Sequence, residues 1–364
     1  MNNESLTYGH ETYHTDYSQY VPDAAYLDCG RVRANNTKKI QFIIALVASS
    51  CIAVLALTYL FQYVVAFILK SVAPEALSIS WFPMLLASFS MYVIGMGGGY
   101  LILRRIPVAA PQKKSLSIGH WLIILLICFG MMYTGNIIGV LVNTVISLFT
   151  KSAVQNPVNS AISSLPEWAI ILTTVIAAPI FEELFFRKLM LDRLKPLGQL
   201  PALVVTGVVF GLFHGNLSQL FYATLLGFVL GFVYLKTGNI FHTIALHMTI
   251  NFCGSIIPLK LIELVQPTLD KFTAMGGAEF DASMLGATDL VALAVYFSYA
   301  ALVMVVWGAG LVLFFMFIKK YKLNGKQLPL TNGRSSLRVV VTSPFAIAAM
   351  LVFVFMIVSS IIPA

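Results

Sequence analysis

Charged residues are scarce in this chain. Only 10% of its 364 residues are Asp, Glu, Lys or Arg, whereas 59% are hydrophobic. Soluble domains are about 25% charged and roughly 45–50% apolar. The mean hydropathy of +0.86 points the same way. This composition excludes an ordinary soluble domain and predicts a polytopic membrane protein.

Cysteine is scarce as well. The four cysteines, three of them in apolar segments, are scattered along the chain: Cys29, Cys51, Cys128 and Cys253. They show neither the spacing of a zinc site nor that of a disulfide framework. The first forty residues are polar, so no signal peptide is expected. The formal charge of +8 is explained by cationic cytoplasmic loops, so no nucleic-acid partner is expected either.

Long apolar runs are abundant. They cover about 41–69, 80–103, 119–149, 167–194, 200–214, 217–235, 240–258, 289–318 and 339–361. Most exceed the ~20 residues that a membrane-spanning helix needs. The runs predict an all-α, polytopic transmembrane helical bundle with eight or nine spans. The protein is therefore expected to be integral and multi-pass, in the cell membrane if its source is bacterial.

The positive charges predict the orientation of these spans. If the spans alternate and the N-terminus is cytoplasmic, 19 of the 23 Lys and Arg residues fall on the cytoplasmic side. The other side then holds only Lys70, Lys151, Lys260 and Lys271. Such a bias is typical of cytoplasmic loops. We therefore expect a cytoplasmic N-terminus.

The runs also divide the chain into regions. We expect a polar, mobile N-terminal tail over 1–40, N-terminal transmembrane helices over 41–150, an extracytoplasmic loop over 259–288 and C-terminal transmembrane helices over 289–364. The loop is interpreted as a linker, with a lid as the alternative. The stretch GMGGG at 95–99 lacks the strand–turn–helix setting of a phosphate loop, which favours helix packing through small residues, or a kink.

Three charges stand inside an apolar run, in the stretch EELFFR. Burying one ionisable side chain near the bilayer centre costs roughly 2.5–3.5 kcal/mol on insertion scales. Glu183 and Arg187 are four residues apart, so they share a helical face and can pair. Glu182 points about 100° away and is left free. The alternative is that all three charges are structural.

Two further polar patterns lie at a similar depth. FGLFHG contains Phe210 and His214, and HMTIN contains His247 and Asn251. Each alone is typical of packing or of an interhelical hydrogen bond. Counted from the expected turns at 195–198 and 236–239, Glu182, His214 and Asn251 stand about 20–26 Å up their helices, and His247 about one turn lower. Four polar side chains on three helices can therefore converge.

Such a cluster suits hydrolysis of a peptide bond. A carboxylate and an imidazole in a desolvated cavity can polarise water, and the N–H donors of His247 and Asn251 can stabilise an oxyanion. Cys253 lies on another face, so a thiol mechanism is not expected. Zinc bound by Glu182, His214 and His247 is an alternative. Since the pattern HExxH is absent, no metal or other cofactor is expected.

The three patterns, in this order, resemble the signatures EExxxR, FxxxH and HxxxN of the CPBP family, also called Abi, which includes CaaX prenyl endopeptidases and bacteriocin-processing enzymes. The resemblance covers about 166–258, which is thereby expected to be a CPBP-like catalytic core. It implies an intramembrane glutamic endopeptidase, a hydrolase of the CaaX protease type, in which Glu182 activates water with the help of His214.

The same resemblance implies roles for the remaining motif residues. His247 and Asn251 would form the oxyanion site, while Glu183, Arg187 and Phe210 would support the site structurally. The expected partners are a peptide or protein substrate in or at the membrane, with or without a lipid, and membrane lipids. Two alternatives are open: a non-enzymatic bacteriocin self-immunity or membrane scaffold protein, and a proton-coupled transporter.

Overall fold

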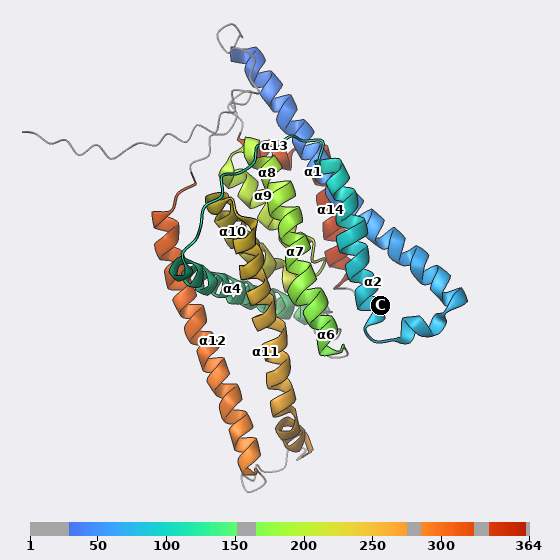
Figure 1. Ribbon diagram of the computed structural model, residues 1–364, viewed down its shortest axis with the longest axis vertical. Coiled ribbons are helices and arrows are strands. Elements are labelled where there is room, and N and C mark those ends of the chain that lie inside the picture. The colour runs from blue at the N-terminus through green and yellow to red at the C-terminus, as the bar shows by residue number, and fades with distance from the viewer. Residues whose placement is uncertain (1–28, 151–164, 275–284, 324–334, 362–364) are drawn as a thin grey trace, which may run out of the picture.

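The computed structural model describes residues 29–150, 165–274, 285–323 and 335–361, and within these ranges the protein is built from helices without a strand (Figure 1). The longer helices and helical segments are α1 (Cys29–Val72), α2 (Phe82–Phe89), α3 (Met96–Leu103), α4 (Ile118–Thr150), α7 (Ala178–Glu183), α9 (Gln199–Leu212), α10 (Leu217–Thr237), α11 (Ile240–Ala274), α12 (Ala287–Lys320), α13 (Ser336–Val341) and α14 (Pro344–Ser359). Shorter segments are η2 (Pro74–Ser78), α6 (Glu167–Ile170), α8 (Asp192–Leu194) and η6 (Lys195–Leu197).

The described helices confirm a multi-pass membrane protein. Seven of them are long and apolar enough to cross a bilayer, namely Asn35–Val72, Phe82–Leu103, Ile118–Thr150, Glu167–Leu197, Leu217–Thr237, Ile240–Ala274 and Ala287–Lys320. The helices α9 and α14 are apolar but shorter. Together these helices correspond to the apolar runs of the sequence, so the predicted all-α transmembrane bundle is correct. The cytoplasmic position of the N-terminus stays a prediction.

Helix α1 begins earlier than the sequence suggested. The predicted N-terminal tail extended to residue 40, but α1 starts at Cys29; residues 1–28 lie outside the described part. The segment from 31 to 40 contains Arg, Lys and Ala, which are good helix formers, and it has no Gly or Pro. A helix can therefore continue beyond its apolar run.

The predicted loop at 259–288 is mostly helix as well. Helix α11 continues to Ala274 although Pro258 and Pro267 lie inside it, and α12 begins at Ala287. Helical side-chain pairs support this extension: Lys260 Nζ lies 3.1 Å from Glu263 Oε2. Residues 275–284 lie outside the described part of the chain. The apolar run ended where polar residues began, but the helix did not.

Asp289, near the start of α12, joins the ends of α11 and α12. It accepts hydrogen bonds from Thr268 Oγ1 at 2.9 Å and from Lys271 Nζ at 2.6 Å. Both donors lie in the part of α11 that was expected to be loop. The helical extension of α11 is therefore also used in packing.

The GMGGG stretch packs helix against helix. A Cβ atom on Gly95 would lie 2.8 Å from the backbone oxygen of Val54 in α1, and one on Gly99 would lie 2.8 Å from Phe185 Cε2. These separations are too short for any larger residue without a shift. The interpretation as small-residue packing is therefore correct. This packing places residues 95–99 against α1 and against Phe185, which follows the paired glutamates.

Three segments have the wider turn of a π-helix: η3 (Ser90–Gly95), η4 (Ile171–Ala177) and η5 (Leu184–Leu191). Segments η4 and η5 flank α7, which carries the two glutamates, and η3 lies beside it. A π-helical turn frees backbone groups from the regular ladder and is often found at functional sites. The fold therefore concentrates irregular backbone around the paired glutamates.

Candidate active site

The polar motif residues come from three neighbouring parts of the bundle. Glu182 and Glu183 end α7, His247 and Asn251 lie in α11, and His214 lies in the turn between α9 and α10. The residue after His214 is Gly215, whose φ of 65° favours glycine and lets the chain reverse sharply. The turn thus holds the imidazole close to the end of α9, facing the interior.

Glu183 is the centre of a buried charge cluster. Its Oε2 lies 3.1 Å from Nε of Arg187, and both side chains are 0% exposed. The predicted pair at i and i+4 is therefore present. Its Oε1 lies 3.1 Å from Nδ1 of His247. Because the carboxylate can only accept, the contact requires the proton of His247 to be on Nδ1.

His247 therefore lies between the two glutamates. Its other ring nitrogen, Nε2, lies 3.8 Å from Oε2 of Glu182, whose side chain is 15% exposed. Glu183 orients the ring, and the ring faces Glu182. The sequence suggested that Glu183 pairs with Arg187, but not that it also binds His247 from a helix 64 residues further along.

Phe210 connects the three motifs. The guanidinium carbon of Arg187 lies 4.8 Å from the centre of the Phe210 ring, a cation–π contact. The same ring lies 5.3 Å from the imidazole of His214 and 5.8 Å from that of His247. The family resemblance implied only that Phe210 supports the site structurally. The structure shows that it contacts both histidines and the arginine.

Glu182 and His214 share a small cavity of about 160 Å³, which is lined by Met91, Tyr92, Met96, Glu182, Phe186, Phe213 and His214. The Nδ1 atom of His214 is 3.0 Å from the backbone oxygen of Phe210. If Nδ1 donates to this oxygen, Nε2 is left as an acceptor. The cavity thus contains a carboxylate and an oriented imidazole.

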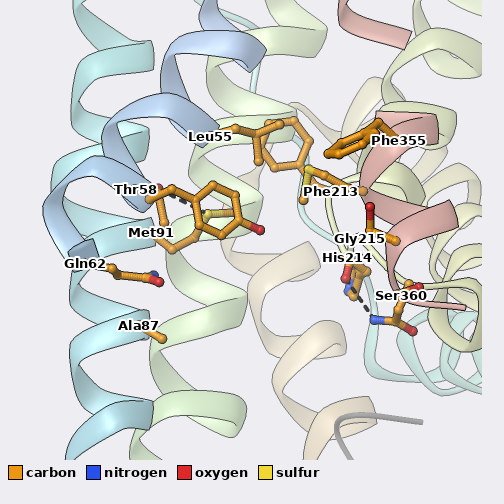
Figure 2. A pocket seen from close by; sticks show the side chains of 14 residues that line it. Leu55, Thr58, Gln62, Ala87, Met91, Phe213, His214, Gly215, Phe355 and Ser360 are labelled. Carbon is orange, nitrogen blue, oxygen red and sulfur yellow. Dashed lines mark hydrogen bonds between the residues drawn. The ribbon is translucent and has the colours of Figure 1, made fainter. Parts of the chain in front are cut away.

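A second cavity of about 620 Å³ adjoins the first and shares Met91, Phe213 and His214 with it. Figure 2 shows it between Thr58, Gln62, Ala87 and Met91 on one side and His214, Gly215, Phe355 and Ser360 on the other. Its lining is mainly apolar, with amide and hydroxyl groups at Gln62, Asn216, Ser359 and Ser360. His214 therefore lies where the two cavities meet.

Asn251 is held by another contact. Its Nδ2 donates to the backbone oxygen of Thr174 at 2.9 Å, within the π-helical segment η4. In the part of the chain that the structure describes, the residues lining the two cavities include neither Asn251 nor His247. The oxyanion role of these two residues stays a prediction.

Tyr92 is a site residue that the sequence analysis missed. It lines the smaller cavity, and its hydroxyl oxygen is 3.5 Å from Oε1 of Glu182. Its ring stacks on that of Phe181, the residue before Glu182, with centres 5.4 Å apart and planes 9° from parallel. Tyr92 lies in an apolar run without a motif, so no sequence signal singled it out.

The residues present do not form an evident metal site. Across the described ranges, no group of three or more His, Cys, Asp and Glu side chains is arranged to hold a metal ion. Nδ1 of His247 faces Glu183, and Nδ1 of His214 faces a backbone oxygen, which leaves the Nε2 atom of each ring available, as it is in metal-binding histidines. The zinc alternative is therefore left to a chelator experiment.

Comparison with known proteins finds a similarity in the central helices. Residues 164–253, the Rce1-like segment, match the family model described as "Type II CAAX prenyl endopeptidase Rce1-like". This segment is similar to that family. The Rce1-like segment contains all three motifs and the turns between them, while α1, Tyr92 and α12 lie outside it. The family signatures and the buried cluster around Glu183 thus fall in the same segment.

A bacterial relative extends the comparison. The chain is 28% identical over 165 residues to a Bacillus subtilis (strain 168) protein named "Putative membrane peptidase YdiL". This alignment covers 44% of the chain and 66% of that relative, slightly less than two thirds of its length. No solved structure matches the chain.

Proposed function

We propose that this protein is a membrane-embedded endopeptidase in which Glu182 and His214 activate a water molecule. The observation that carries this proposal is that both side chains line one cavity of about 160 Å³ inside the bundle. One water occupies about 30 Å³ of liquid, so the cavity has room for a few molecules. The Rce1-like segment and the peptidase name of the Bacillus relative support the same class of reaction.

The reaction follows from the acceptors in the cavity. A water molecule lies between Glu182 and His214, and its oxygen attacks the carbonyl carbon of the scissile peptide bond. Glu182 accepts the proton that the water loses. The tetrahedral intermediate then collapses, the C–N bond breaks, and the proton passes from Glu182 to the leaving amine. The substrate is thereby divided into a carboxylic acid and an amine; the acid loses its remaining proton to the amine or to water, and Glu182 is again a carboxylate.

His247 is proposed to donate from Nε2 to the oxyanion of the tetrahedral intermediate, a role that requires a proton on both ring nitrogens because Nδ1 already donates to Glu183. Its Nε2 faces Oε2 of Glu182 at 3.8 Å, and Glu183 holds the ring from the other side. A hydrogen-bond donor aimed at developing negative charge stabilises the transition state most when water is excluded. Asn251 is proposed to complete the oxyanion site with the second hydrogen of its amide, since the first is donated to Thr174.

The adjoining cavity of about 620 Å³ is proposed to hold the substrate. Its size lies within the range of roughly 300–1,000 Å³ that ligand sites have. The apolar side chains suit an apolar segment of a membrane peptide or a lipid attached to it. The amide and hydroxyl groups of Gln62, Asn216, Ser359 and Ser360 suit the peptide backbone beside the scissile bond.

The test uses the full chain in lipid nanodiscs with a library of prenylated and unmodified transmembrane peptides, read by mass spectrometry with and without a chelator. Glu182→Gln and His214→Ala are compared with Glu263→Gln, which alters a carboxylate that is 55% exposed and distant in sequence. We expect wild type and the control to cut, and the two site variants to lose cleavage.

The other outcomes are equally informative. Cleavage that the chelator abolishes would favour the zinc alternative over water activated by Glu182 alone. Cleavage that persists in Glu182→Gln would overturn the proposed mechanism. If wild type leaves every peptide uncut, the peptidase proposal fails for these substrate classes, and the immunity or scaffold alternative takes its place.

A further inference from the structure

Glu182 needs a fixed orientation to act as a base, and its own helix does not supply one. A glutamate side chain has several freely rotating bonds, and this one borders a cavity rather than packed neighbours. Its Oε2 faces Nε2 of His247. The partner on the side of Oε1 is the hydroxyl of Tyr92, at 3.5 Å. Contacts on both oxygens restrict the carboxylate more than either contact alone.

The position of Tyr92 is itself well determined. Its ring stacks on that of Phe181, which directly precedes Glu182 in α7. Tyr92 therefore contacts the same short segment of α7 that carries Glu182. Tyr92 lies in the π-helical segment η3, which ends at Gly95. Gly95 is packed so closely on α1 that an added Cβ would be 2.8 Å from the oxygen of Val54. The hydroxyl therefore projects from a segment that packs closely on α1.

We infer that Tyr92 is a positioning residue for Glu182: its hydroxyl donates to Oε1 and keeps the carboxylate aimed at the cavity that it shares with His214. This inference rests on the proposed function. The separation of 3.5 Å is at the long limit for a hydrogen bond. Catalytic hydrogen bonds are often long without substrate and shorten when the substrate binds. Tyr92 lies outside the Rce1-like segment of 164–253, so the match to that family does not include it.

The test separates the hydroxyl from the ring. Tyr92→Phe removes the donor but keeps the stack on Phe181, whereas Tyr92→Leu removes both. The control is Tyr100→Phe, which alters a tyrosine that is 45% exposed and lies two turns further along the same span. The probes are one farnesylated and one unmodified transmembrane peptide, each with a fluorophore and a quencher on opposite sides of the peptide. Both kcat and KM are measured in nanodiscs, together with thermal unfolding.

We expect Tyr92→Phe to lower kcat by about 10- to 100-fold, the effect of losing one hydrogen bond to a charged group, while KM and thermal stability stay at the values of the control. Equal kcat values for wild type and Tyr92→Phe, with a loss only in Tyr92→Leu, would show that the ring packs and the hydroxyl does nothing. A fall in kcat that follows a fall in thermal stability would likewise overturn the inference.

The two proposals fail differently. If wild type cuts a probe and Glu182→Gln does not, the proposed function stands, and the Tyr92 variants alone decide the inference. If wild type cuts neither probe, or if Glu182→Gln cuts as well as wild type, the base that Tyr92 would position is absent. The inference then fails together with the proposed function.

Discussion

The buried pair of Glu183 and Arg187 allows a sharp test of the charge cluster. Arginine stays protonated in proteins, whereas a carboxylate can take up a proton and become neutral. Glu183→Gln therefore leaves a permanent buried charge, since the Arg187 side chain is 0% exposed. Arg187→Met leaves a carboxylate that still has the Nδ1 proton of His247 at 3.1 Å and can also be protonated.

The magnitudes follow from burial. Breaking a buried ion pair by removing one partner costs about 3–5 kcal/mol. We expect Glu183→Gln to reach the upper part of that range and Arg187→Met the lower part. Replacing both partners leaves no unpaired charge, so the double variant is expected to regain most of the loss. At about 2–4 °C per kcal/mol, the single variants would unfold roughly 6–20 °C lower than wild type.

The assay is thermal unfolding in nanodiscs, followed by tryptophan fluorescence at one scan rate because membrane proteins often unfold irreversibly. The matched control is Lys188→Met, one position further along: its Nζ is 3.7 Å from Asp192 Oδ2, and its side chain is 44% exposed. Asp192 is buried, but it keeps Lys195 Nζ at 2.7 Å and the Tyr234 hydroxyl at 2.9 Å. Loss of the half-exposed Lys188 is therefore expected to cost only about 0–1 kcal/mol. Single variants as stable as this control, or a double variant worse than both, would refute the reasoning.

The remaining predictions concern packing and the other motif residues. Gly95→Ala is expected to cost about 1–3 kcal/mol, because its Cβ would meet a backbone oxygen of α1 at 2.8 Å, whereas Gly97→Ala has nothing within 4 Å and should be neutral; thermal unfolding compares the two. Asn251→Leu leaves the backbone oxygen of Thr174 without its donor, so we expect a loss of about 1–3 kcal/mol, and an unchanged melting temperature would contradict this contact. Cys253→Ala should cut peptides at the rate of wild type, and a large loss of cleavage would revive a thiol mechanism.

Local spacing predicted the parts of the site that a single helix determines. Glu183 and Arg187 pair as expected because residues four apart share a helical face wherever that helix lies. The same holds for the apolar runs, whose length and composition suit a bilayer whatever their neighbours are. The helix ends were less predictable: α11 continues to Ala274 because polar helical turns remain stable once side chains such as Lys271 find partners on α12.

The sequence by itself predicted that the polar groups of three motifs lie at similar depths in a membrane bundle. Tertiary structure decided which of them touch. His247 binds Glu183 as well as facing Glu182, Asn251 donates to a π-helical carbonyl, and Tyr92 reaches Glu182 across 90 residues of chain. Rise per residue sets the depth of a side chain, but the rotation of each helix about its axis depends on packing. That rotation is set by close contacts such as Gly95 on α1 and Phe210 against both histidines.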